Sequence, residues 1–265
     1  MLLRIDHLVI AVRDPDACAA IMERDLGLAV TGGGRHEHSG TFNRLAFLGD
    51  TYLELIGVFD RSLVEASAAF AVARASLALL DEGREGLATY AVATDDVAAE
   101  VARLRAAGSP IGKPVPGSRT RPDGEVVRWA TAFPVLGPER PPFLIEHELA
   151  GAEWGDGARE ARAAFRHPAG GAVRLAGLTI PAADPAAAAA RYRDVLGIEV
   201  GVDGSAALGD QLVRLTPPAE DPLPVVALTA EPGSPTLDVV RFGIRWTRSA
   251  DATAERRPAT DSAIR

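Results

Sequence analysis

The chain is poor in cysteine, lysine and aromatic residues. Its 265 residues include one cysteine, Cys18, and one lysine, Lys113, and aromatic residues make up 5% of the total. A single cysteine excludes an intramolecular disulfide and a thiolate metal cluster, so we expect Cys18 to be a buried structural thiol. No apolar run is long enough for a membrane span, and the N-terminal run is too short for a signal peptide. We therefore expect a cytoplasmic protein that has no membrane partner.

Positive charge is also in deficit. The 28 Lys and Arg residues are outnumbered by 36 Asp and Glu residues, which gives a formal net charge of −8. Without a basic stripe the chain lacks the electrostatic footprint of a nucleic-acid-binding protein. Hydrophobic residues make up 47% of the chain, which is enough for two compact units or one elaborate one.

The first 60 residues predict the order β, α, β, β, β. Residues 3–12 alternate and are rich in β-branched side chains, and Asp14-Pro15 then supplies an N-cap and a proline at the first helical position. Gly27 is expected to end this helix, with a strand resuming at 28–30. After a glycine-rich loop, GGGRHEHSG, the runs TFNRLAFLG and TYLELIGV predict two strands that form a hairpin at Gly49-Asp50.

The same pattern recurs near the C-terminus. The matched landmarks are Asp14-Pro15 with Asp184-Pro185, Leu26-Gly27 with Leu196-Gly197, and FLGDTYLEL (47–55) with ALGDQLVRL (207–215). The chain therefore contains an internal repeat. The second copy is shorter between these landmarks, so the glycine-rich loop is an elaboration of the first copy, and extra loop length is where function usually resides.

A weaker copy lies between these two, and together the copies predict an α+β fold of tandem βαβββ modules. In this copy TYAVATDD (89–96) predicts a strand that leads into a capped helix, and VVRWATAFP (126–134) and PFLIEHEL (142–149) predict its closing strands. We expect a paired domain (1–150, modules 1–60 and 87–150 joined by a helix over 62–83), a loop-rich linker (151–171), a degenerate third module (172–248) and a polar tail (249–265).

Two side chains with metal-binding chemistry stand mid-strand among apolar neighbours. The side-chain period of two puts His7 on the face opposite Leu8, and Glu54 on the face opposite Leu53 and Leu55. Either residue alone is more often a satisfied core or surface residue. Together an imidazole and a carboxylate suit a divalent metal such as Zn, Ni, Fe or Mn.

These strands resemble a known family. IDHLVIAVRDPD and GDTYLELIGV resemble the first and last strands of a vicinal-oxygen-chelate module, the fold of glyoxalase I and extradiol dioxygenases. GGRHEHSGTFNRLAFLGDTYLELIGV, RPDGEVVRWATAFP and PFLIEHEL together resemble the glyoxalase-like domain family over residues 1 to about 150. The resemblance implies two curved half-barrels that form one cleft, with metal-ligand roles for His7 and Glu54.

The resemblance also implies that the second module supplies ligands, and here the pattern is only half kept. PFLIEHEL aligns Glu146 with Glu54 and puts His147 on the opposite face, whereas LATYAVA has no His, Glu or Asp at the place of His7. The expected set is therefore His7, Glu54 and Glu146, which either hold a metal together with water or hold none.

The elaborated loop contributes two further histidines. His36 matches the GGRH element of the family, and we expect it to act with Glu146 in acid–base catalysis, because histidine titrates near neutral pH. The alternative for His36 and His38 is an exposed loop position. His167, in the linker, is expected to be exposed.

Substrate contacts are expected from Arg128, Asn43 and Arg121. Guanidinium groups present paired donors that match carboxylates and enolates, and the alternative is a solvated loop whose arginines are neutralised by neighbouring acids. Strand parity puts Arg128 and Trp129 on opposite faces. At most one of these two is then expected in the cleft, and the family resemblance favours Arg128.

The C-terminal copy has lost both metal-ligand positions. Gly177 stands where the first copy has His7, and Arg214 stands where it has Glu54. No metal site is expected there, and this module could cover, dimerise or support the first pair, so a homodimer is one expected assembly.

The leading hypothesis is a metal-dependent enzyme that acts on a small anionic substrate with two adjacent oxygens. Isomerase, lyase and dioxygenase chemistry are all compatible with a metal that acts as a Lewis acid. The alternative is a metal-free protein that binds or sequesters a small molecule, as resistance proteins of this superfamily do. Fold alone does not decide between them.

Overall fold

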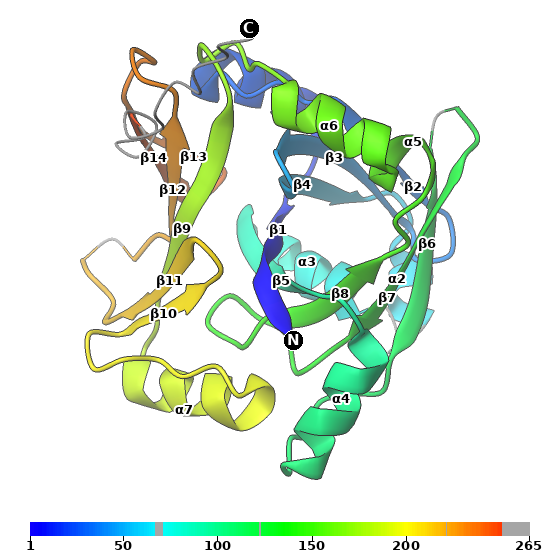
Figure 1. The fold of residues 1–265 in the computed structure, drawn as a ribbon, viewed down its shortest axis with the longest axis vertical. Helices are drawn as coiled ribbons and strands as arrows, with labels where there is room; N and C mark the ends of the chain where they lie inside the picture. The colour runs from blue at the N-terminus through cyan, green and yellow to red at the C-terminus, as the bar shows by residue number, and fades with distance from the viewer. Residues whose placement is uncertain (67–70, 122, 221, 251–265) are drawn as a thin grey trace, which may run out of the picture.

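A computed structural model describes residues 1–66, 71–121, 123–220 and 222–250 (Figure 1). The first module contains β1 (Leu2–Ala11), α1 (Pro15–Ile21), β2 (Gly32–His36), β3 (Thr41–Leu48) and β4 (Thr51–Val58), with one π-helical turn, Met22–Leu26, after α1. The predicted module order and the hairpin after β3 are confirmed. The second strand begins at Gly32 and not at residue 28, so the first half of the glycine-rich segment, which was expected to be a loop, forms β2.

The second module follows two short helices. These are α2 (Arg61–Ala66) and α3 (Ala71–Asp81), and the module contains β5 (Gly86–Thr94), α4 (Val97–Ala106), β6 (Val115–Thr120), β7 (Val126–Ala132) and β8 (Phe143–His147). The expected connecting helix over 62–83 corresponds to α2 and α3, and residues 67–70 of that prediction lie outside the described residues. Both modules are therefore βαβββ units, as predicted.

The repeated Asp-Pro pairs start their helices in the same way. The Asp14 carboxylate accepts backbone N–H bonds at the start of α1, and the Asp184 carboxylate does the same at the start of the C-terminal helix α7 (Pro185–Leu196). The helical segments end at Gly27 and Gly197, each with φ of 65°. A positive φ favours glycine because it lacks a Cβ, so the repeated landmarks have one physical cause.

The two modules close into one barrel. Its strand order is β1-β4-β3-β2-β6-β7-β8-β5, and β1 and β5 join the modules as antiparallel neighbours. On the other side β2 meets β6 at Arg35 and Thr120. A Cβ at Gly34 would lie 2.4 Å from the Thr120 carbonyl oxygen, so closure depends on glycine in the glycine-rich segment.

The linker was expected to be rich in loops, but most of it is helical. It contains α5 (Gly151–Trp154) and α6 (Asp156–Ala164), and α6 lies across one end of the barrel near β3 (Figure 1). His167, expected to be exposed, is buried instead. Its ring accepts a bond from Ala29 N at 3.1 Å and donates to Phe47 O at 2.9 Å, so it fastens the linker to the first module.

The C-terminal sheet is an opened version of the barrel. It contains β9 (Val173–Pro181), β10 (Ser205–Leu208), β11 (Gln211–Thr216), β12 (Val225–Ala230), β13 (Leu237–Arg241) and β14 (Ile244–Ala250), in the order β10-β11-β9-β12-β14-β13. The parallel and antiparallel pairings match those of β3-β4-β1-β5-β8-β7 one by one. Within the described residues no strand corresponds to β2 or β6, so this sheet stays open. Residues 251–265 of the expected tail lie outside the described part of the chain.

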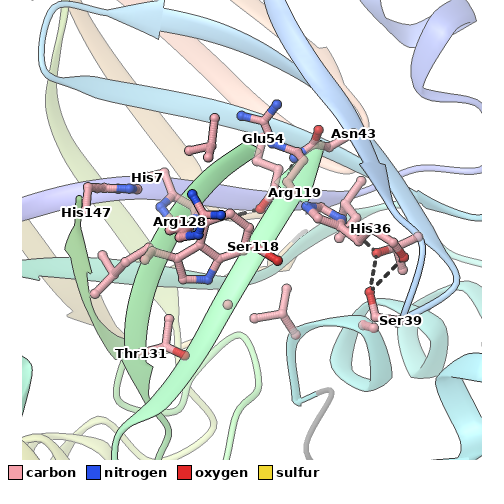
Figure 2. Close-up of a pocket in the computed structure, with 18 of the residues that line it drawn as sticks. His7, His36, Ser39, Asn43, Glu54, Ser118, Arg119, Arg128, Thr131 and His147 are labelled. Atoms are coloured by element: carbon pink, nitrogen blue, oxygen red, sulfur yellow. Dashed lines mark hydrogen bonds and ion pairs between the residues drawn. The ribbon is translucent and has the colours of Figure 1, made fainter. Parts of the chain in front are cut away.

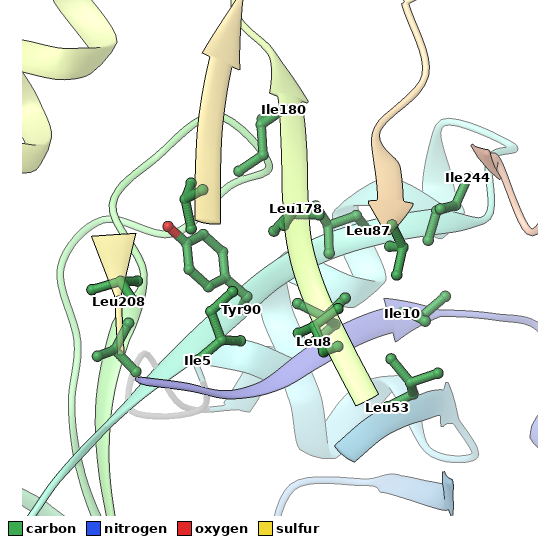
Figure 3. Close-up of a cluster of buried hydrophobic side chains, with 14 of the residues drawn as sticks. Ile5, Leu8, Ile10, Leu53, Leu87, Tyr90, Leu178, Ile180, Leu208 and Ile244 are labelled. Carbon is green, nitrogen blue, oxygen red and sulfur yellow. The ribbon is translucent and has the colours of Figure 1, made fainter. Parts of the chain in front are cut away.

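One apolar core joins the sheet to the barrel. Figure 3 shows Ile5, Leu8, Ile10, Leu53, Leu87 and Tyr90 of the barrel beside Leu178, Ile180, Leu208 and Ile244 of the sheet. The barrel side chains come from the outer faces of β1, β4 and β5, so strand alternation sends one set into this core and the other into the barrel. Cys18, as expected, is a buried thiol of this core, where burial raises its pKa to about 11.

The helices of the described residues are too short or too polar to span a membrane.

Polar bonds at the edge of this core tie the sheet to the barrel, and they generate a stability prediction. The Gln211 side chain accepts from Ile5 N at 2.7 Å and donates to Thr51 Oγ1 at 3.0 Å, and Gln211 is buried. Gln211→Ala should lower the free energy of unfolding by about 1–3 kcal/mol, because it leaves a buried backbone N–H unpaired. Urea unfolding measures the change, and Asp210→Ala, at the exposed neighbouring position, is the control. Equal stability of the two variants would contradict the assigned role of Gln211.

Candidate functional site

The barrel encloses a cavity of about 470 Å³, which is lined by side chains from the inner faces of both modules. His7 of β1 and Glu54 of β4 line this cavity together with Asn43 of β3, as Figure 2 shows. His7 and Glu54 are 3% and 7% exposed, which makes both nearly buried. The structure therefore brings the two mid-strand polar residues into one cavity.

Asp6, next to His7 in sequence, links the two modules. Its Oδ1 atom lies 2.7 Å from His7 Nδ1 and 3.0 Å from His147 Nε2, at the end of β8. Consecutive residues of a regular strand point to opposite faces, but the β1–β5 register shifts between Ile5 and His7. This irregularity lets Asp6 and His7 meet through their side chains.

The Asp6 carboxylate is held ionised by its two histidine partners. Burial alone would raise the pKa of Asp6, but the charges and hydrogen bonds of His147 and His7 outweigh it and hold that pKa well below its usual range. An ionised carboxylate only accepts hydrogen bonds, so His7 Nδ1 and His147 Nε2 both carry the donated protons. Asp6 thereby sets the tautomer of neutral His7, whose Nε2 is left as the acceptor.

Glu54 is oriented from the opposite side. Asn43 Nδ2 donates to Glu54 Oε1 at 2.6 Å, while Asn43 Oδ1 accepts from Gly34 N at 2.9 Å, which fixes the amide. The other carboxylate oxygen, Oε2, lies 3.7 Å from His7 Nε2. The Tyr52 ring stacks on the His7 ring with centroids 4.4 Å apart. Each group that faces the gap between His7 and Glu54 is therefore held in place by a neighbour.

His36 and His38 both line the cavity, and of these two only His36 has a hydrogen-bond partner among the described residues. Its Nδ1 lies 2.9 Å from Thr41 Oγ1, and its ring meets Trp129 edge to face with centroids 6.1 Å apart. Burial lowers the pKa of His36 from its usual 6.5 to about 4, against an opposing effect of the Glu54 charge. His36 is therefore neutral near physiological pH. His38 is exposed, which matches the alternative for it.

The linker completes the cavity wall. Glu153 of α5 forms a buried ion pair with Arg119 at 2.5 Å, and Arg119 also donates to Gly33 O at 2.8 Å. Trp154 stacks on His147, with centroids 3.8 Å apart. The sequence contains no local signal for these roles, because each depends on how a segment after β8 returns to β6 and β2.

The expected convergence of Glu146 with His7 and Glu54 was wrong. Glu146 Oε2 accepts from Val97 N at 2.9 Å at the start of α4, so its side chain lies outside the barrel. Strand register explains the error. Equivalent positions of the two modules can be found by counting back from the aspartate that caps the next helix. In the first module Val9, five residues before Asp14, pairs with Glu54. In the second module Ala91, five residues before Asp96, pairs with Phe143. The counterpart of Glu54 is therefore Phe143, and the polar side chain of this strand that lines the cavity is His147, one residue beyond Glu146.

The expected substrate-binding arginines separate. Arg121 does not line the cavity, because its guanidinium pairs with Asp123 at 3.0 Å and with Glu153 at 3.1 Å. Arg128 borders the cavity and is exposed. Trp129 also lines the cavity, so the expectation that only one of these neighbours would do so was wrong. A bulky ring on the inner face and a long, flexible side chain at an exposed position can both reach one cavity.

The residues present do not form a complete metal site. Module two has Thr89 at the position of His7, counted back from the helix cap, and Phe143 at that of Glu54. Within the described residues no group of three His, Cys, Asp or Glu side chains is placed to hold a metal ion. His7 and Glu54 are two donors, and the third expected one, Glu146, lies outside. The C-terminal sheet has neither metal-ligand side chain. Thr179, five residues before the helix cap Asp184, pairs with Arg214, so Arg214 stands at the position of Glu54, and Gly177 stands at the position of His7.

Comparisons with known proteins agree with this architecture. A family model described as a glyoxalase-like domain matches residues 5–196. A crystal structure of a hypothetical protein from Staphylococcus aureus has a TM-score of 0.74 at 14% identity, and the match covers 93% of this chain and 98% of that chain. This likeness shows the fold. No curated protein matches.

Two further solved structures are methylmalonyl-CoA epimerases. The Streptomyces coelicolor enzyme, in complex with 2-nitronate-propionyl-CoA, is 27% identical with a TM-score of 0.41, covering 55% of this chain and 97% of its own. The Mycobacterium tuberculosis enzyme is 22% identical with a TM-score of 0.41, covering 55% and 88%.

The lowered pKa of His36 generates a pH prediction. Unfolded His36 takes up a proton near pH 6.5 and folded His36 only near pH 4, so the unfolded state binds more protons between these values. Stability should therefore fall as pH is lowered through this window, with His36 contributing on the order of 1–2 kcal/mol. Urea unfolding at both ends of the window should show a shallower pH dependence for His36→Gln. His167, whose pKa burial also lowers, should leave a residual slope in the variant. An unchanged slope would contradict this account.

Proposed function

Because the chain belongs to the glyoxalase-like domain family of the vicinal-oxygen-chelate superfamily, we propose that it is an enzyme that moves a proton on a small anionic substrate. Glu54 is the proposed base and His7 its partner. The observation that carries this proposal is the position of His7, held by Asp6 at 2.7 Å on one nitrogen and facing Glu54 at 3.7 Å with the other.

The gap between His7 and Glu54 suits a proton transfer. At 3.7 Å the two facing atoms are too far apart for a direct hydrogen bond. A substrate C–H next to a carbonyl group could approach Glu54 Oε2 and give it the proton, while the C–H electron pair moves toward the carbonyl to form an enolate. Return of the proton to another position is an isomerisation, and loss of a leaving group is a lyase reaction.

The neighbours of Glu54 and His7 support this chemistry. Asn43 binds one oxygen of Glu54 and leaves the other free to receive the proton. For this step His7 would first take up a proton from solvent at Nε2, and Nε2–H would then face the developing enolate oxygen, with the ionised Asp6 stabilising that imidazolium. Each of these groups is oriented before substrate arrives, which reduces the reorganisation that the reaction requires.

The cavity wall supports the substrate class that we propose. Trp129, Phe133 and Phe143 line it with aromatic surface, and its volume of about 470 Å³ falls in the range of small-ligand sites. Arg119 is paired with Glu153, whereas Arg128 borders the cavity and forms no ion pair among the described residues. An acid with a compact apolar body and a C–H next to its carbonyl or carboxyl group, such as a hydroxy acid or keto acid, fits this division.

Glu54→Gln should abolish proton exchange without unfolding the protein. Wild-type protein in D2O should exchange the hydrogen next to the carbonyl or carboxyl group of a bound acid, followed by proton NMR. Loss of the base should slow this exchange by roughly 10²–10⁴-fold. Glu146→Gln is the matched control, because that carboxylate lies on the outside of the same barrel and should leave exchange unchanged.

The outcome separates two candidate functions. Equal exchange in the Glu54→Gln variant and wild type would reject Glu54 as the base. Binding of acids with no exchange by wild-type protein would instead support the second candidate, a small-molecule-binding protein, which the aromatic wall of the cavity favours.

Arg128→Ala should weaken binding of acids but not of neutral analogues of the same shape. The loss should be about tenfold or less, because the guanidinium is exposed and its interaction with an anion is screened by water. Calorimetric titration of matched acid and amide pairs measures it. Equal affinity of wild-type protein for both members of a pair would reject the anionic substrate.

A further inference from the structure

A second cavity lies outside the barrel, where α6 meets the edge of the C-terminal sheet. Its volume is about 550 Å³, and its wall comes from α6, the β3–β4 turn, the start of β9 and the β10–β11 turn. Arginines occupy four positions in this wall, and three of them, Arg4, Arg159 and Arg162, are only partly exposed. The proposed reaction uses none of these residues.

Arg162 is held in place by contacts that leave one edge of its guanidinium without a partner. Its Nη1 donates to Glu153 O, and its guanidinium carbon lies 4.8 Å from the Phe47 ring centroid and 4.7 Å from that of Trp154. Its Nε and Nη2 atoms are buried and have no hydrogen-bond partner among the described residues. Together Nε and Nη2 form the edge that binds a carboxylate or phosphate through two parallel bonds.

Arg4 repeats the deficit on another element. Its Nη2 donates to Asp50 O at 3.4 Å, whereas its Nε is buried and unpartnered within the described part of the chain. Buried N–H groups of a charged side chain that find no acceptor cost free energy, so such groups are normally paired. Two arginines from different elements thus line one cavity with N–H groups that lack an acceptor.

The acids of this wall do not supply that acceptor. Asp50 pairs with Arg159 at 3.3 Å. Asp156, Glu160 and Asp210 are exposed, and none of them forms an ion pair among the described residues. Exposed carboxylates are hydrated and screened, so they affect anion binding less than the partly buried guanidinium groups do.

We propose that this second cavity binds a small oxyanion, either a carboxylate or a phosphate, through the Nε–Nη2 edge of Arg162 and Nε of Arg4. The anion would complete the hydrogen bonding of both arginines. The anion would bind where α6 of the linker meets β1 and the C-terminal sheet. It would therefore hold α6 against both of these elements. Trp154, whose ring contacts the Arg162 guanidinium in the wall of the second cavity, lines the first cavity.

The test is thermal unfolding of the full chain with increasing inorganic phosphate or malonate, at constant ionic strength held with chloride. The midpoint of wild-type protein should rise and then saturate with at least one of the two anions, because a ligand that binds only the folded state stabilises it. The anion that raises the midpoint at the lower concentration identifies the ligand class. Trp154 fluorescence should change over the same concentration range.

Variants assign the effect to the second cavity. Arg162→Gln should abolish the saturable rise of the midpoint. Arg162→Lys should weaken binding of the anion about tenfold, because lysine keeps the charge but not the paired donors. Arg4→Gln should also weaken it and remains informative if Arg162→Gln fails to fold. Arg193→Gln, at an exposed arginine of α7, should respond like wild type. Arg128→Gln, at the first cavity, reports how much of a response comes from that cavity.

Two outcomes would overturn the proposal. One is the absence of a saturable response of wild-type protein to both anions. The other is an equal response of wild type, Arg162→Lys and Arg4→Gln. A response lost in Arg128→Gln and kept in the Arg4 and Arg162 variants would place the anion in the first cavity. That result would support the anionic substrate and reject the second site.

Discussion

The carboxylate of Asp6 is the contact on which the site depends, because one oxygen atom receives a histidine from each module of the barrel. His7 comes from the first strand and His147 from the last strand of the barrel domain. Unpaired burial of this carboxylate would be costly, so its two partners hold β1 and β8 in a fixed relation. The same bonds determine which nitrogen of neutral His7 faces Glu54, and they therefore connect barrel closure to chemistry.

Closure makes this arrangement possible. The close approach at Gly34 lets β2 meet β6, and Arg119 crosses the join by donating to Gly33 O while it pairs with Glu153 of the linker. The linker is thus part of the cavity wall. The C-terminal sheet repeats the central pairings without these closing strands, and it packs its apolar face against the barrel through the shared core.

The predictable parts of the structure follow from local rules, and the remainder depends on distant contacts. Strand alternation predicts that His7 and Glu54 leave the apolar face, and the Asp-Pro and glycine landmarks predict the repeated modules. The same alternation puts His147 and Glu146 on opposite faces of their strand. Aligning LIEH with YLEL by similarity matches Glu146 with Glu54, and this led to the wrong prediction that Glu146, and not His147, faces the cavity. Asp6 reaches His7 only through an irregular strand register, and Trp154 reaches His147 only because α5 folds back, so neither role has a sequence pattern.

The most direct test of this account is the protonation of the two histidines that share Asp6. Nitrogen-15 NMR of the imidazole rings distinguishes Nδ1–H from Nε2–H in each residue. We predict that neutral His7 carries its proton on Nδ1 and His147 on Nε2, and that Asp6→Asn alters both signals together. A proton on Nε2 of neutral His7, or histidine signals that do not respond to Asp6→Asn, would contradict a site organised by the shared carboxylate.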